Sequence, residues 1–550
     1  MRKSQTTTLS NNIFFEAGSI KRPFQRQNNQ TRKIPKDLKN VLADPKEHPL
    51  VHPKQDKIYL GNSTAKPENP ERYPIYLPKD IFDKNLFIAA APGGGKSTLL
   101  FRILAQAIKT QRSVFISEAK AGNQGYAEGA AFNDITRYLK LKYPHLLLHR
   151  WPRGDVYFNP LMYLNTSVKR REFFDNLCEQ IQTQGHITGD IVAFIHNATA
   201  IADLIIEFLQ TFTPKEDLNK NCTLQSLVYF LRHPDKLKQT LAKAIKYYEQ
   251  TGNNPQASAI IKDIYAQLKS RNFFFLEKPE LNGSRHGVNL LTNLFDHPDL
   301  LYYSQPQPNL QELKLEDILY QQALVIISQP LYDTASKVVG PLFWDSVLGK
   351  TVELGPKPPQ YEGKERLSIL AVFDETHRLP VGRLGTSGDF TREYRLGLVE
   401  ITPTIVDPER WFANRHVYQT LISLSPGVPE VVELMQSRLP NFFLNSTYVQ
   451  TMMDGTGMAQ PFIGTVPNHK YQNSQDNPGC SLRSLAMTGK FTGLLQSFEL
   501  DGEGKVFWLD LQDELLANIK TLLEDALKPN CPSDIHSALD YVLGLEEFLL

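Results

Sequence analysis

The sequence predicts an α/β protein whose sheet is mostly parallel and whose chain is interrupted by an inserted all-α domain. An apolar run at 85–89 leads through a glycine-rich loop into a helical pattern, and apolar runs at 113–117 and 146–151 follow, separated by helical segments. This β-α-β-α-β order implies that the strands pair in a parallel sheet. From about residue 167, long amphipathic patterns replace strand signals, and apolar strands resume at 323–328.

The glycine-rich loop has the composition of a phosphate-binding loop. Consecutive glycines let backbone N–H groups turn towards a phosphate, and the helix that follows adds the partial positive charge of its N-terminus. Lys96 can reach the β- and γ-phosphates, and the Ser97 hydroxyl can ligate Mg²⁺. We therefore predict ATP and Mg²⁺ as ligands; the alternative is a glycine-rich turn without function. The predicted binding residues are Pro92, Gly93, Gly94, Gly95, Lys96, Ser97 and Thr98.

The next two strands end in polar or turn-forming residues. The strand at 113–117 runs into Glu118-Ala119-Lys120-Ala121-Gly122, and the strand at 146–151 leads to Asn159-Pro160-Leu161. Ligands of open α/β sheets bind at the carboxyl ends of the strands. The turn that begins at Glu118 is therefore expected at the edge where a ligand binds.

A second decisive stretch is the apolar run from Leu367 to Phe373, which ends in Asp374 and Glu375. Asp374 can hold the Mg²⁺ shell, and Glu375 can orient and deprotonate an attacking water. Two adjacent carboxylates at the end of a core strand repel each other unless a cation lies nearby. The alternative interpretation is a pair of acids that cap the next helix.

The rest of the chain has fewer chemical signals. Further strands are predicted at 396–402 and 417–422, and a hairpin between 494 and 510, followed by two helices without visible chemistry. Four arginines are candidates to reach the γ-phosphate of a neighbouring subunit. They are Arg392, Arg395, Arg410 and Arg415.

These signals predict five parts of the chain. They are a basic N-terminal arm at 1–75, a first ATPase part at 76–166, an all-α insertion at 167–312, a second ATPase part at 313–445 and a C-terminal extension at 446–550. The first 57 residues hold 12 Lys and Arg against 5 Asp and Glu. Such an arm either contacts nucleic acid or anionic lipid, or is a solvated tail or a clamp on the globular body.

Composition predicts a cytoplasmic protein. The formal net charge is +1, and the four cysteines lack metal-ligand spacing. No segment is expected to reach the apolar length of a membrane span, and the N-terminus has no signal-peptide pattern.

The order of these motifs resembles the HerA/FtsK superfamily of hexameric DNA-pumping ATPases, and most of all the coupling proteins of conjugation and type IV secretion. That family carries a P-loop, a strand ending in Asp-Pro-Lys-Gly, an Asn-Pro-Leu, an all-α insertion and an Asp-Glu. The resemblance covers about residues 80 to 425 and implies a RecA-like ATPase domain. It also implies that Arg392, just ahead of the strand at Leu396, is the arginine that acts on the next subunit.

Several positions depart from the family pattern. Ala90 replaces the first P-loop glycine, Glu118-Ala119 replaces Asp-Pro, and Pro403 stands where the family has a glutamine that senses the γ-phosphate. The sequence is also expected to lack the membrane-spanning N-terminus of true coupling proteins. A soluble relative, or a HerA-like ATPase of DNA repair, mobility or defence, is as compatible with the sequence as a secretion motor.

Three functions follow from this pattern. The first is a Mg²⁺-dependent ATPase that translocates DNA as a homo-oligomeric ring, expected to be a hexamer, with a relaxase or a secretion channel as a further partner. Lys96, Glu375 and Arg392 would be its catalytic residues, and Ser97 and Asp374 its metal ligands. The second is a nucleotide-binding module that recruits a partner with little hydrolysis, favoured by Ala90 and Pro403. The third is a P-loop kinase, which Glu375 disfavours because it would activate water. The sequence does not say whether DNA would be single- or double-stranded.

Overall fold

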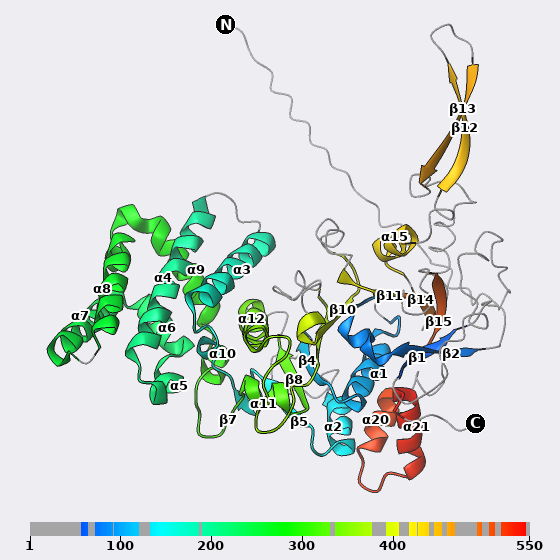
Figure 1. The fold of residues 1–550 in the computed structure, drawn as a ribbon, viewed down its shortest axis with the longest axis horizontal. Helices are drawn as coiled ribbons and strands as arrows, with labels where there is room; N and C mark the ends of the chain where they lie inside the picture. The colour runs from blue at the N-terminus through cyan, green and yellow to red at the C-terminus, as the bar shows by residue number, and fades with distance from the viewer. Residues whose placement is uncertain are drawn as a thin grey trace, which may run out of the picture.

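The computed structural model has the predicted α/β architecture, an 11-stranded sheet beside a group of helices (Figure 1). The structure describes residues 57–63, 72–91, 93–119, 133–185, 190–252, 254–329, 336–376, 392–405, 417–425, 427–438, 445–453, 459–467, 492–497, 505–511 and 519–545. The strands of the large sheet are β1 (Lys57–Ser63), β2 (Tyr73–Pro78), β3 (Leu86–Ala90), β4 (Ser113–Glu118), β5 (Leu147–Trp151), β8 (Ala323–Ser328), β9 (Ile369–Asp374), β10 (Leu396–Thr402), β11 (Thr420–Leu424), β14 (Thr492–Ser497) and β15 (Val506–Asp510).

The strand order is β2-β1-β15-β14-β11-β3-β10-β9-β4-β8-β5. From β11 to β5, all neighbours are parallel, whereas β14, β15, β1 and β2 extend the sheet with antiparallel pairs. Strands β3, β4, β8 and β9 are buried along their whole length. Burial on both faces explains why these strands are continuous apolar runs rather than alternating ones.

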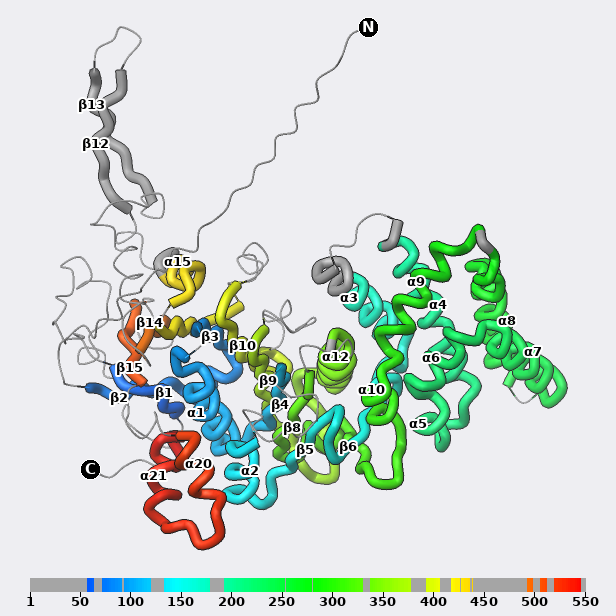
Figure 2. The backbone as a smooth tube through the Cα atoms, turned by 180° about the vertical axis from the view of Figure 1, so that it is seen from behind, coloured from blue at the N-terminus to red at the C-terminus, as the bar shows by residue number. Residues whose placement is uncertain are grey.

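Helices cover both faces of this sheet. Side chains alternate along β3, so that Leu86 and Ile88 lie in one apolar core and Phe87 and Ala89 in the other. The first core is covered by α1 (Lys96–Lys109), α2 (Asn133–Lys142), α20 (Ile519–Ala526) and α21 (Ser533–Leu543), as Figure 2 shows from behind. The second core is covered by α12 (Ser336–Leu354), and this core continues into the helical region.

The helical region lies to one side of the sheet. Its helices are α3 (Ser167–Gly185), α4 (Asp190–Phe212), α5 (Leu218–Asn221), α6 (Leu224–Arg232), α7 (Pro234–Thr251), α8 (Pro255–Ser270), α9 (Asn282–Phe295) and α10 (Pro298–Tyr303). Two short strands, β6 (Val156–Tyr157) and β7 (Gln311–Glu312), pair where the chain enters and leaves it, and α11 (Leu315–Tyr320) leads back to β8.

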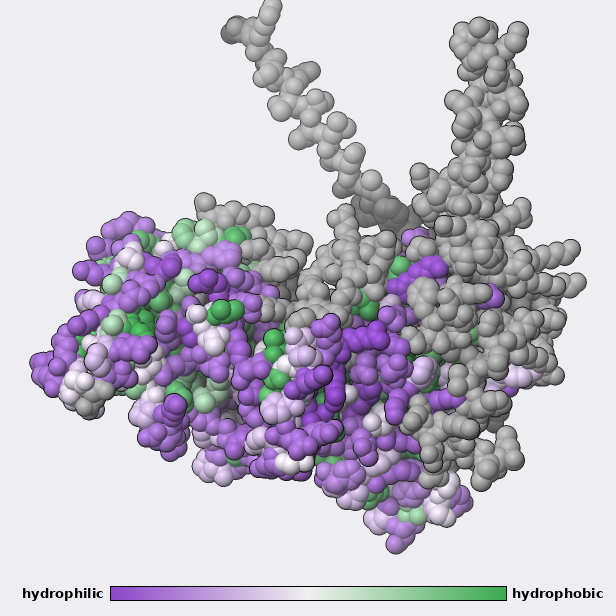
Figure 3. Space-filling view, viewed as in Figure 1, coloured by the Kyte–Doolittle hydropathy of each residue, from purple (hydrophilic) through white to green (hydrophobic). Residues whose placement is uncertain are grey.

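Helix α4 corrects the expectation that no segment reaches the apolar length of a membrane span. Val192–Phe212 is long and apolar enough to cross a membrane, with a mean hydropathy of 1.6, but 56% of that window is buried inside the protein. It packs against α3, α8 and α9, and the side of the region seen in Figure 3 is mostly hydrophilic. The apolar composition of α4 is therefore explained by its place in the helical core.

Two parts that the sequence sets apart from the sheet contribute strands to it. Lys57–Ser63, inside the predicted N-terminal arm, pairs with both β2 and β15. The predicted C-terminal hairpin exists as β14 and β15, and β14 pairs with β11. Between them in the chain, α15 (Pro429–Ser437) precedes a separate antiparallel pair, β12 (Asn445–Met453) and β13 (Ala459–Pro467).

Candidate nucleotide-binding site

The glycine-rich loop lies between β3 and α1, as the sequence predicts. Gly95 caps α1 with a left-handed φ of 97°, a conformation that glycine adopts without strain. Gly94 donates its N–H to the Ala91 carbonyl at 3.0 Å. A Cβ on Gly94 would lie 2.6 Å from the backbone oxygen of Ser425, just beyond β11. The close approach of a second chain segment therefore requires glycine at 94.

The predicted acids lie at the carboxyl end of β9. Asp374 is the last residue of the strand, and Glu375 follows with a φ of 65°, unusual for a residue with a side chain. The next residue, Thr376, donates its N–H to the Ile401 carbonyl of β10 at 3.1 Å. This turn brings both carboxylates to the edge of the sheet where the glycine-rich loop lies.

Lys96 connects the two predicted motifs. Its Nζ lies 3.5 Å from Oδ1 of Asp374 and donates a hydrogen bond to Oε1 of Glu375. The exposed fractions of the three side chains are 9%, 3% and 12%, so the cluster is shielded from solvent. The structure thus brings together residues that are 279 positions apart in the chain.

The cluster carries two carboxylates for one ammonium group. In a shielded site, an excess carboxylate favours a cation, and Mg²⁺ takes one or two carboxylates together with substrate phosphate and water oxygens. Among the described residues, no group of three His, Cys, Asp or Glu is placed to hold a metal by itself. The donor set therefore fits Mg²⁺ brought with a phosphate better than a site made of protein ligands alone.

The other predicted binding residues are distributed as follows. Ser97 is half-buried and Thr98 is buried in the first turn of α1, beside Lys96. Pro92 lies outside the described residues, as do Lys120, Arg410 and Arg415.

Arg392 lies away from this cluster. It begins a short 3-10 helix, Arg392–Tyr394, ahead of β10, and its side chain is exposed. Strands β3, β9 and β10 are parallel. Arg392 therefore lies at the amino ends of these strands, and the glycine-rich loop lies at their carboxyl ends. A strand of this length spans about 20 Å, at about 3.3 Å per residue. Arg392 therefore does not meet Lys96 within one chain.

A buried ion pair that the sequence does not indicate lies along the same edge of the sheet. Glu118, at the end of β4, accepts a hydrogen bond from Nη1 of Arg150 on β5 at 3.1 Å, and the two side chains are 0% and 2% exposed. The same nitrogen donates to the Ser328 hydroxyl of β8 at 3.1 Å, and Nη2 donates to Asn133 at 2.9 Å. Arg150 thus links the ends of β4, β5 and β8, and Glu118 is its carboxylate partner on β4.

Another buried pair joins Glu400 of β10 to Tyr418, two residues before β11. The Tyr418 hydroxyl donates a hydrogen bond to Oε1 of Glu400. Burial and this carboxylate raise the pKa of Tyr418 well above its usual value. The Tyr418 hydroxyl therefore stays protonated, and a hydrogen-bond donor, over the whole physiological pH range. Pro403, half-buried, follows the end of β10 and has no N–H or polar side chain to offer a phosphate.

Comparison with known proteins gives matches only among solved structures. No protein-family model matches the chain, and no match was found among curated protein sequences. The plasmid coupling protein TrwB in complex with a non-hydrolysable ATP analogue, ADPNP, is 10% identical, with a TM-score of 0.49, covering 86% of this chain and 92% of TrwB. VirB4 of Thermoanaerobacter pseudethanolicus is 14% identical, with a TM-score of 0.43, covering 83% and 96%.

The structures that resemble this chain thus include a conjugative coupling protein, the class of protein that the motifs resemble. At such identities and with TM-scores below 0.5, these likenesses leave the activity to be argued from the residues of the site.

Proposed function

We propose that this chain is a Mg²⁺-dependent ATPase that translocates DNA as a ring of identical subunits. The observation that carries this proposal is the meeting of Lys96 with Asp374 and Glu375 at the mouth of a glycine-rich loop. This arrangement supplies a phosphate cradle, a cation site and a base for water in one place.

Each residue has a distinct task in hydrolysis. Lys96 donates hydrogen bonds to the phosphate oxygens, and Ser97 and Asp374 are the residues that would hold Mg²⁺, which neutralises phosphate charge when bound. Glu375 accepts a proton from the water that attacks the γ-phosphorus, while the bond from this phosphorus to the β-phosphate oxygen breaks. The surrounding burial strengthens these interactions.

The position of Arg392 supports the proposed ring. An exposed arginine at the far edge of the sheet can meet a nucleotide only on a neighbouring subunit. DNA would thread the pore, bound by basic loops, so that its affinity falls steeply with salt. A relaxase or secretion channel remains the expected further partner, and a function in DNA repair or defence suits the same site.

A recruitment module with little hydrolysis is the second candidate. Pro403 favours it, because a proline after β10 cannot donate a hydrogen bond to a γ-phosphate. DNA-stimulated phosphate release by the wild-type protein would exclude it.

Replacing the proposed base tests the enzyme. Glu375→Gln keeps the shape of the side chain and removes its basicity, so we expect ATP binding to persist and turnover to fall by at least about a thousandfold. Phosphate release and fluorescent-nucleotide binding are measured with and without DNA. Glu365→Gln, on an exposed side chain ahead of β9, is the matched control and should behave as wild type. Unchanged turnover in Glu375→Gln would remove this residue from the mechanism.

A further inference from the structure

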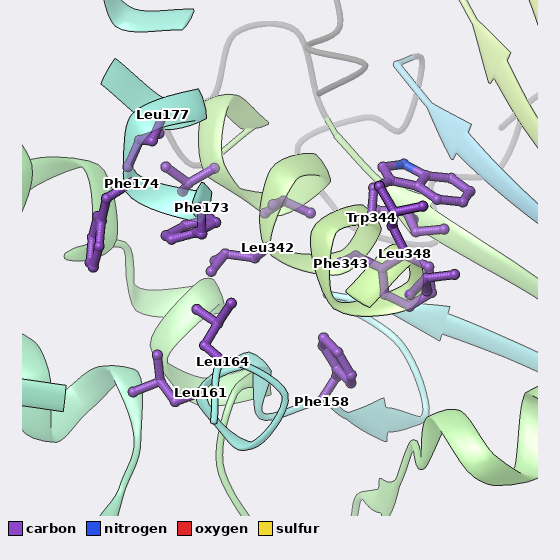
Figure 4. Packing of buried hydrophobic residues seen from close by; sticks show 14 of the residues in the cluster. Phe158, Leu161, Leu164, Phe173, Phe174, Leu177, Leu342, Phe343, Trp344 and Leu348 are labelled. Carbon is purple, nitrogen blue, oxygen red and sulfur yellow. The ribbon is translucent and has the colours of Figure 1, made fainter. Parts of the chain in front are cut away.

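Trp344 occupies the layer between the sheet and the helical region. It lies on α12, is completely buried, and belongs to the apolar core that joins the two parts. Figure 4 shows Trp344 and Phe343 on the side of α12 that faces the strands, with Leu342 towards Phe173.

The indole of Trp344 contacts two strands at once. Its Nε1–H donates a hydrogen bond to the Ser117 hydroxyl of β4 at 2.8 Å. Its ring lies against Phe373 of β9, with the ring centroids 4.8 Å apart. Ser117 and Phe373 are register partners in the parallel pairing of β4 with β9.

The Ser117–Phe373 pair is the last register pair of β4 and β9 before the two acids. Phe373 is followed directly by Asp374 and Glu375, and the paired positions of β4 and β9 end at Ser117 and Phe373. A buried indole N–H is costly to leave without a partner, so the Ser117 hydroxyl fixes the indole laterally. The ring in turn fixes the strand end from which both carboxylates project.

The opposite side of α12 is also fixed. Asp345 accepts a hydrogen bond from Asn176 of α3 at 3.4 Å, and Glu353 accepts one from Lys169 at 2.7 Å. Nearer the sheet, Phe343 packs against Trp151 and Phe158. The helix that carries Trp344 is therefore fixed by contacts to α3 and to the sheet. A residue held in this way can fix the position of the strand end that it contacts.

We propose that Trp344 is a positioning residue for Asp374 and Glu375, acting through its bond to Ser117 and its contact with Phe373. The inference rests on the proposed function, because it assigns a role in placing the carboxylates used there. It predicts that loss of the Trp344–Ser117 bond lowers catalytic turnover and weakens the response to Mg²⁺, while nucleotide affinity without Mg²⁺ stays unchanged.

Two variants remove the same bond from its two ends. Ser117→Ala deletes only the acceptor, and Trp344→Phe keeps an aromatic ring against Phe373 but deletes the donor. For each variant we expect kcat for ATP to fall about tenfold, with KM changed less than about twofold, because a small misplacement of reacting groups costs mainly the chemical step. The double variant should lose no more than either single variant, since the two changes break one interaction.

Phe343→Leu is the matched control. It removes a ring that packs against Trp151, Phe158 and Trp344 itself, but it keeps the Trp344–Ser117 bond and the Trp344–Phe373 contact. It should therefore lower the melting temperature and leave kcat at moderate temperature unchanged.

The outcomes are separable from failure of the proposed function. The Mg²⁺ midpoint for binding of a fluorescent ADP needs no hydrolysis, and both variants should raise it several-fold. If wild-type protein hydrolyses ATP while Ser117→Ala matches it in both kcat and Mg²⁺ midpoint, the positioning role is wrong and the function stands. If wild-type protein shows no Mg²⁺-dependent nucleotide binding, the function falls, and the inference with it.

Discussion

Gly94 has much less room in the glycine-rich loop than Gly93. Its Cα faces the Ser425 carbonyl, which is fixed in turn because the Ser425 N–H donates to the Thr492 carbonyl of β14 at 2.7 Å. The loop is therefore shaped partly by the antiparallel strands that continue the sheet. Since a backbone oxygen cannot rotate away as a flexible side chain can, any side chain at 94 must displace the loop.

Gly94→Ala is expected to weaken ATP binding at least about tenfold, equivalent to about 1.4 kcal/mol, because the displaced loop no longer directs its N–H groups at phosphate. Gly93→Ala is the comparison, since a Cβ at that position would meet no atom within 4 Å and only its φ of 84° is strained. Fluorescent-nucleotide titration measures both variants. Equal losses in the two would contradict the steric explanation and leave backbone strain alone.

The positions of some residues at the candidate site could be predicted from the sequence, and the contacts of others could not. Lys96, Asp374 and Glu375 could be predicted because each ends or begins an element whose apolar pattern is local. Trp344 and Ser425 could not, because their contacts depend on strand register and on the approach of segments distant in the chain. The sequence signals for such residues are weak: a tryptophan in an apolar helix is expected to be core.

At the scale of elements, the helical region depends on the close crossing of α4 and α9. Gly283 and Gly287 both face Phe194, and a Cβ on Gly287 would lie 2.4 Å from the Phe194 backbone oxygen. The two helices have the most extensive contact between helices in the described part of the chain. Small residues one turn apart thus set the distance between these helices.

Gly287→Ala should destabilise the protein by about 1–3 kcal/mol, because the added methyl group meets backbone and forces the helices apart. Gly349→Ala, in α12, is the matched control: its nearest neighbour would be a Lys169 methylene carbon at 3.6 Å, an ordinary contact. That control should be neutral or stabilise by up to about 1 kcal/mol through helix propensity. Thermal or urea unfolding measures both, and a Gly287→Ala variant as stable as wild type would exclude the close crossing.

The parallel strands could be located from the sequence because burial on both faces makes them uninterrupted apolar runs. The antiparallel end of the sheet could not be assembled in the same way. Lys57–Ser63 pairs with a strand near residue 510, and its neighbours in sequence are polar and basic. Pairing over such a separation leaves no local pattern.

At the scale of the whole molecule, the two ends of the parallel strands, called here the carboxyl edge and the amino edge of the sheet, carry different parts of the proposed site. Lys96 and the two acids lie at the carboxyl edge, and Arg392 lies exposed at the amino edge. In one chain these parts stay separate by roughly the length of a strand, about 20 Å. They can act on one nucleotide only if the amino edge of one subunit meets the carboxyl edge of another.

The most direct test of a site shared between subunits mixes two variants that are each defective. Lys96→Ala removes the phosphate-binding lysine, and Arg392→Ala removes the arginine proposed to act on the neighbour, so each should be almost inactive alone. In a mixture, a site with intact Lys96, Asp374 and Glu375 can receive Arg392 from an adjacent Lys96→Ala subunit. We predict that ATP hydrolysis recovers to roughly a quarter of the wild-type rate in equimolar mixtures, because about one interface in four then joins two intact halves. A mixture as inactive as its components, or an Arg392→Ala variant as active as wild type, would contradict the account.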